Sequence, residues 1–222
     1  MIDQLIDKQD SFEIVRDQIA GILVSEIMNQ YALAEAAGKD PDDWDFNVYT
    51  ERSNPWDQFA DTERTKQAPI VNVWYDTSGF DQKASNARFR QKADGIFNID
   101  CYGLGWSKDN PDGGHFPGDQ LAAFEVQRVV RLVRNILMHS DYTYLGLQGL
   151  VWSRWINTIS VFQPPYDNRN ALHIQGARVV LAVSFNETTS IPESPGTLDY
   201  IAIDIHRASD GLVTVEADYD FS

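Results

Sequence analysis

The sequence is poor in cysteine and in long apolar runs. Its 222 residues include one cysteine, Cys101, which excludes an internal disulfide and a zinc site built from several cysteines. No apolar run approaches the ~20 residues that a membrane-spanning helix needs. Residues 1–10 lack the basic and apolar regions of a secretory signal. We therefore expect a protein of a reducing compartment.

Positive charge is scarce as well. The sequence has 18 lysines and arginines against 33 aspartates and glutamates, which gives a formal net charge of -15. A general nucleic-acid-binding protein needs a basic face that displaces counterions from phosphates, so this balance argues against one. The charge fits a soluble protein, and it is compatible with a protein that lines a path along which DNA slides without sticking.

Sequence signatures of catalysis and of cofactor binding are missing. The segment GLGWS contains neither the dinucleotide-binding pattern nor the P-loop pattern, so we interpret Gly103 and Gly105 as turn glycines. The patterns G-x-S-x-G and H-E-x-x-H are also absent. The histidines show no metal-ligand spacing, and we interpret them as separate surface or half-buried side chains: His115, His139, His173 and His206. We expect no catalytic residue, no metal and no cofactor.

Two further groups have a structural interpretation. Cys101 shares a predicted strand face with Phe97 and Ile99, and we expect a buried thiol because nothing near it in the sequence would lower its pKa. Four aspartates surround a turn whose spacing lacks the glycine and the distal glutamate of an EF-hand. A solvated acidic turn is therefore favoured over a calcium site at Asp40, Asp42, Asp43 and Asp45.

The remaining pattern is typical of an α+β domain. Residues 10–38 predict one long amphipathic helix, with Asp10 and Glu13 spaced as a capping box. A second amphipathic helix is predicted over residues 119–139, and alternating segments predict strands at 45–52, 69–76, 95–103, 152–165 and 171–187. We expect a single domain over residues 1–222, built as a largely antiparallel β-sheet with the helices packed on one face. Residues 197–218 predict a C-terminal β-hairpin extension.

One loop of this arrangement predicts a projecting β-hairpin arm. Residues 77–94 join two predicted strands and are too many for a tight turn. The loop is also locally basic, because it contains Lys83, Arg88, Arg90 and Lys92.

The second predicted helix carries a stripe of arginines in the segment FEVQRVVRLVRNILM. Arg128, Arg131 and Arg134 recur every three residues and form one oblique ridge, opposite a side rich in valine. Three interpretations stay open: a solvated face with intrachain ion pairs, a contact with an acidic neighbouring subunit, and DNA binding. An acidic N-terminal half and a basic middle suit head-to-tail association, which closes into rings.

The order of these elements resembles the tail-terminator, or tail-completion, proteins of tailed bacteriophages. The resemblance covers residues 11–187 and is greatest to tail or neck proteins of contractile-tailed phages. It lies in a long N-terminal helix followed by the segments PIVNVWYD, GIFNIDCYG, AAFEVQRVVRLVRNILM, YLGL, VFQPP and HIQGARVVLAVSFNE.

The resemblance implies a virion structural protein, assembled in the cytoplasm of a bacterial host. It implies a hexameric ring that caps the tail tube and joins the tail to the head–neck connector, while DNA passes through its lumen without specific binding. The implied partners are other copies of the chain, the tube protein, the neck proteins and the sheath. Arg128, Arg131 and Arg134 are then candidates for the ring interface. Candidates for contact with a neighbour or the tube are Lys83, Arg88, Arg90 and Lys92.

Other functions remain compatible with the sequence. A head–tail stopper, another neck protein or a baseplate component would have the same composition. A nuclease or hydrolase would need several carboxylates that converge on a metal, and no such set stands out. A nucleic-acid-binding module would act through the basic middle segment, with an affinity that falls steeply as salt rises.

Overall fold

The computed structural model describes residues 9–60, 68–81, 90–109, 114–164, 172–188, 200–207 and 213–220. By internal contacts the chain divides into two compact units, Met1–Thr188 and Thr189–Ser222. The second unit holds the predicted C-terminal hairpin, whose strands β8 (Tyr200–Arg207) and β9 (Val213–Asp220) pair antiparallel. That this hairpin extends a single domain stays a prediction, and its turn lies outside the described residues.

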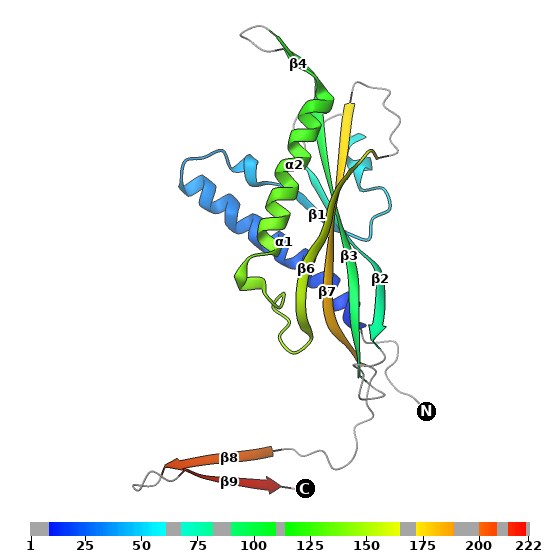
Figure 1. The fold of residues 1–222 in the computed structure, drawn as a ribbon. Helices are drawn as coiled ribbons and strands as arrows, with labels where there is room; N and C mark the ends of the chain where they lie inside the picture. Colours follow the sequence, from blue (N-terminus) through cyan, green and yellow to red (C-terminus); the bar gives the residue numbers. More distant parts are fainter. Residues whose placement is uncertain are drawn as a thin grey trace. The chain divides into compact units, whose positions relative to one another are not determined.

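The first unit is built on a five-stranded sheet in the order β1-β2-β3-β7-β6 (Figure 1). Its strands are β1 (Asn47–Thr50), β2 (Ile70–Asp81), β3 (Arg90–Trp106), β6 (Val151–Phe162) and β7 (Leu172–Thr188). The pair β1–β2 is parallel, and the other pairs are antiparallel. The predicted α+β class with a largely antiparallel sheet is confirmed.

Two long helices accompany the sheet: α1 (Ser11–Ala36) and α2 (Gly118–Leu137). The start of α1 is capped as its sequence predicts, because the backbone N–H of Asp10 donates to the Glu13 carboxylate at 2.9 Å. Gly38, with a φ of 66°, follows the end of α1 in the left-handed conformation that glycine adopts without strain. Short elements complete the unit: η1 (Pro41–Trp44), η2 (Pro55–Ala60), η3 (Ser140–Tyr142), β4 (Lys108–Asp109) and β5 (His115–Phe116).

The main core lies between both helices and one face of the sheet. Alternate residues of β2, β3 and β7 point into it, as the strand patterns predict, including Val73, Phe97 and Leu181. The helices contribute buried residues such as Leu23 and Val133. Packing of both helices on one face is therefore confirmed. Cys101 is fully buried here, so the predicted buried thiol is confirmed, and burial raises the pKa of this thiol.

The hairpin of β2 and β3 is longer than predicted. The two strands stay paired as far as Asp81 opposite Lys92, so both ends of the predicted loop at 77–94 are strand. Sequence patterning missed this part because its residues are mostly exposed and lack the apolar alternation of a half-buried strand. The paired stretch supports the predicted hairpin arm, although residues 82–89 lie outside the described part of the chain.

The prediction that Gly103 and Gly105 are turn glycines is wrong. Both lie inside β3, and neither is a turn glycine. A Cβ on Gly105 would fall 2.0 Å from the carbonyl oxygen of Gly118 and 2.4 Å from the amide nitrogen of Ala122. A Cβ on Gly103 would lie 2.8 Å from the carbonyl oxygen of Ala122. The glycines are needed because the first turns of α2 press against the backbone of β3.

Candidate functional site

Helix α2 has a buried inner side and an exposed outer side. The inner side packs on the sheet through Val126, Val129 and Val133. The outer side, which we call the α2 outer face, is defined by six exposed residues: Gln120, Phe124, Gln127, Arg131, Arg134 and Met138. The predicted arginine stripe therefore starts at the flank of the helix with Arg128 and crosses onto this face.

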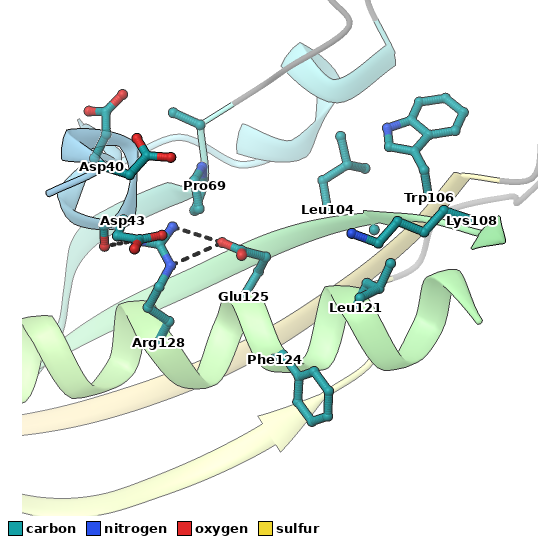
Figure 2. Close-up of a pocket in the computed structure, with 13 residues that line it drawn as sticks. Asp40, Asp43, Pro69, Leu104, Trp106, Lys108, Leu121, Phe124, Glu125 and Arg128 are labelled. Carbon is teal, nitrogen blue, oxygen red and sulfur yellow. Dashed lines mark hydrogen bonds and ion pairs between the residues drawn. The ribbon is translucent and has the colours of Figure 1, made fainter. Parts of the chain in front are cut away.

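Arg128 is engaged within its own chain. Its side chain is only 16% exposed. Its Nε and Nη2 donate to Glu125 at 3.1 and 2.7 Å, and its Nη1 donates to the backbone carbonyl of Asp43 (Figure 2). Arg128 thus ties α2 to the acidic turn at η1, which matches the intrachain ion pair considered for the stripe.

Arg131 and Arg134 differ from Arg128. Both are exposed, and neither forms an ion pair with another described residue. Phe124 on the same face is 53% exposed, and Met138 is exposed as well. The face therefore combines two cations with large apolar side chains, a composition that is enriched at protein–protein interfaces.

Beside Arg128 lies a hollow of about 600 Å³, which we call the acidic hollow. It lies between the start of α2, the end of β3 and the turn at η1, as Figure 2 shows. Its lining contains two cations, Lys108 and Arg128. It also contains four carboxylates, those of Asp40, Asp43, Asp45 and Glu125. Its apolar lining includes Trp106 and Phe124, so the hollow borders the α2 outer face.

Arg90 and Lys92 belong to the start of β3, whereas the hollow is lined by residues at the end of that strand. Lys83 and Arg88 are outside the described residues, and Arg90 begins β3 with a side chain that is not described. Lys92 is half-buried and pairs in register with Asp81. The structure thus brings Arg128 to the hollow, whereas Lys92, the one hairpin cation with a described side chain, does not line it.

The three histidines with described side chains lie in separate elements: His115 in β5, His139 at the start of η3 and His173 in β7. His115 pairs with Asp109 at 3.0 Å, and His139 pairs with Asp141 at 3.5 Å. Both members of each pair are exposed. Within the described ranges, no group of three or more His, Cys, Asp or Glu residues is placed to hold a metal ion. None of the described helices is long and apolar enough to cross a membrane.

A partly buried ion pair on the other face of the sheet, between Asp100 and Arg178, was not anticipated from the sequence. Asp100 accepts hydrogen bonds from Arg178 Nε and Nη2 at 2.6 and 2.9 Å and from Trp74 Nε1 at 3.0 Å. The Asp100 hydrogen bond raises the pKa of Arg178, whose guanidinium also lies 4.8 Å from the Trp74 ring centroid. The sequence places Asp100 and Arg178, which have opposite charges, on the polar faces of two predicted strands. Predicting their ion pair would also have required the register in which the two strands pair.

Comparison with known solved structures gives distant matches. No protein-family model and no curated protein sequence matches the chain. The PVC sheath/tube terminator of an extracellular contractile injection system, solved in its extended state, is 14% identical and aligns with a TM-score of 0.27. The alignment covers 82% of this chain and 64% of the terminator chain. Similarity at this level establishes neither a shared fold nor a shared function.

Proposed function

We propose that the chain is a structural protein of a phage or phage-like contractile tail. Copies join into a ring, which we take to be a hexamer, and the ring caps the tail tube and joins it to the neck connector. DNA passes through the lumen without specific binding. The tube protein, the neck proteins and the sheath are the partners in this proposal, and no catalysis is involved.

The observation that carries self-association is the α2 outer face. A chain with a net charge of -15 keeps Arg131 and Arg134 exposed, beside Phe124 and Met138. Arginine forms planar, bidentate pairs with carboxylates, and apolar neighbours gain free energy when water is removed from them. An acidic surface of a second copy would supply the carboxylates, and contact with it would remove water from Phe124 and Met138.

The ring geometry is supported by the distribution of charge. The outer face of α2 is basic, while the turn at η1 and the acidic hollow carry carboxylates. The basic face and the acidic hollow adjoin at Phe124 but are unlike surfaces. Contacts between unlike, complementary surfaces of two copies are head-to-tail, and such contacts form rings when the rotation closes. The overall negative charge also disfavours adhesion of DNA to the ring.

The first test is electron microscopy of the purified protein over a concentration series, with and without isolated tail tubes. The proposal predicts closed rings at high concentration and rings at tube ends when tubes are present. Rings that ignore the tubes would move the assignment to another connector of the neck or baseplate. Monomers at every concentration, with or without tubes, would contradict the proposal.

A DNA-binding assay separates the ring protein from a nucleic-acid-binding module. We expect no shift of duplex DNA at physiological salt, because the net charge repels phosphate. A shift that weakens steeply with added salt, and that Arg131→Glu removes, would favour the binding module instead.

A further inference from the structure

The acidic hollow has the chemistry of a receptor for a basic segment of protein. We infer that it receives the tip of the β2–β3 hairpin, residues 82–92, from a second copy of the chain. The inference rests on the proposed ring and adds a second contact between copies, beside the contact of the α2 outer face.

The lining of the hollow selects for long cationic side chains. Its carboxylates outnumber its cations, and Arg128 is already paired with Glu125. Trp106 and Phe124, which are 47% and 53% exposed, add aromatic side chains to the lining of the hollow. Lysine and arginine can lay their methylene stems along such rings and still bring their charge to a carboxylate, with an added cation–π attraction.

The hairpin tip has the complementary composition. Residues 82–92 read QKASNARFRQK, with no carboxylate and an aromatic residue among the four cations Lys83, Arg88, Arg90 and Lys92. This is a strong local excess of positive charge in a chain that is acidic overall. The pairing of β2 with β3 continues to Asp81 and Lys92, so a two-stranded stem presents the tip.

The described stem of the hairpin and the hollow lie at opposite ends of β3 within one chain. The hairpin lies at the start of β3, and the hollow is lined by Leu104, Gly105 and Trp106 at the end of the same strand. The 14 residue steps from Arg90 to Leu104 correspond to ~46 Å along an extended strand. Figure 1 shows the paired ends of β2 and β3 at the opposite end of the sheet from the start of α2.

A contact between opposite ends of two copies is heterologous, and it repeats from copy to copy. Such a contact generates a ring or an open filament, and not a twofold dimer. Phe124 belongs both to the acidic hollow and to the α2 outer face, so the same neighbour can cover Arg131 as well.

Cysteine cross-linking tests the inference without changing any charge. The native Cys101 is fully buried, so introduced thiols are the reactive ones. One preparation carries Ala68→Cys at the lining of the hollow, and the other carries Ala87→Cys in the hairpin tip. The control replaces the tip variant with Asn157→Cys, at an exposed position of β6. The preparations are mixed, treated with a short bismaleimide and separated on a denaturing gel.

We expect about tenfold more cross-linked dimer from the Ala68→Cys and Ala87→Cys mixture than from the control mixture, because docking holds the two thiols at a high effective concentration. Adding Lys83→Glu and Arg88→Glu to the tip variant should reduce the product to the control level. Cross-linking of Ala68→Cys copies with each other, as efficient as in the mixture, would indicate a symmetric contact and overturn the inference.

Electron microscopy of the same samples separates the inference from the proposed function. Rings that form without cross-linking above the control would overturn the docking of the hairpin and leave the ring intact. Samples with neither rings nor cross-links would overturn both.

Discussion

The inner and outer sides of helix α2 differ in burial and in composition. The inner side is apolar and buried, and its valines pack against the sheet and α1. The outer side is as exposed as any solvated helix, yet it carries two arginines without a described partner and two large apolar side chains. The comparison indicates that the inner side determines folding, whereas the outer side is free to serve assembly. Mutations on the two sides should therefore separate folding from association.

The largest effect is expected on the inner side. Val133→Asp places a carboxylate where the native side chain is fully buried, and we expect it to cost about 4 kcal/mol or more of unfolding free energy, or to prevent folding. The matched control, Gln127→Asp, lies on the outer face and should change stability by less than about 0.5 kcal/mol. Urea unfolding followed by circular dichroism measures both. Equal losses of unfolding free energy in the two variants would contradict the distinction between the two sides.

The contact of α2 with β3 should be the next most sensitive. Gly105→Ala forces a methyl group against the Gly118 carbonyl, so α2 must shift, at a cost of about 1–3 kcal/mol. Gly21→Ala is the control, because that glycine lies in α1 with nothing within 4 Å of an added Cβ. It should stabilise the protein by up to about 1 kcal/mol. Thermal or urea unfolding that ranks the two variants in the other order would disprove the close approach.

Arg128, at the border between the two sides, should have an intermediate effect. Arg128→Ala removes the bonds to Glu125 and to the Asp43 carbonyl, and we expect a loss of about 1 kcal/mol. Arg131→Ala should be neutral within about 0.5 kcal/mol, because its side chain is exposed. Unfolding midpoints in urea compare the two variants, and a loss for Arg131→Ala as large as for Arg128→Ala would show that the whole stripe is structural.

A pH effect is expected just beyond the C-terminal end of α2. Tyr142 in η3 donates a hydrogen bond of 2.5 Å to Glu26 of α1, which lowers the pKa of Glu26 and raises the pKa of Tyr142 to about 12. The Glu26 contribution is present above its unfolded pKa and is lost as pH falls through its lower folded pKa. The Tyr142 contribution is present below its unfolded pKa and is lost as pH rises through about 12.

Tyr142→Phe removes both contributions. Its loss of stability should therefore be greatest near neutral pH and should shrink on acidification below the ordinary pKa of a glutamate. Unfolding free energies measured from pH 3 to pH 7 give the difference between the two proteins. A difference that is constant over this range would exclude the hydrogen bond to Glu26 as its source.

The elements with strong apolar periodicity were predictable from the sequence. The faces of β3 and β7 and both sides of α2 were read correctly, because alternation and helical spacing mark a one-sided core directly. The stem of the β2–β3 hairpin was missed, because most of its residues are exposed and form no alternating apolar pattern. Gly103 and Gly105 were misread because the need for glycine comes from the close approach of α2. The residues around each glycine in the sequence do not reveal this contact.

The candidate site was predictable only in part. The arginine stripe was found from its spacing, but the different surroundings of Arg128 and Arg131 depend on where the turn at η1 lies. The acidic hollow joins residues from η1, β3 and α2, and no local segment contains it. Charge, in contrast, can be read from the sequence, and it already separates the basic hairpin and stripe from the acidic turn.

The most direct test of assembly through the α2 outer face is the double charge reversal Arg131→Glu and Arg134→Glu, studied by mass photometry and negative-stain electron microscopy. The control Gln120→Glu and Gln127→Glu adds two negative charges to the same face and leaves both arginines in place. We expect the reversal to keep the unfolding free energy within about 0.5 kcal/mol of the wild type and to abolish rings, while the control still assembles. Rings from the reversed variant, at the same concentrations as the wild type, would contradict the account.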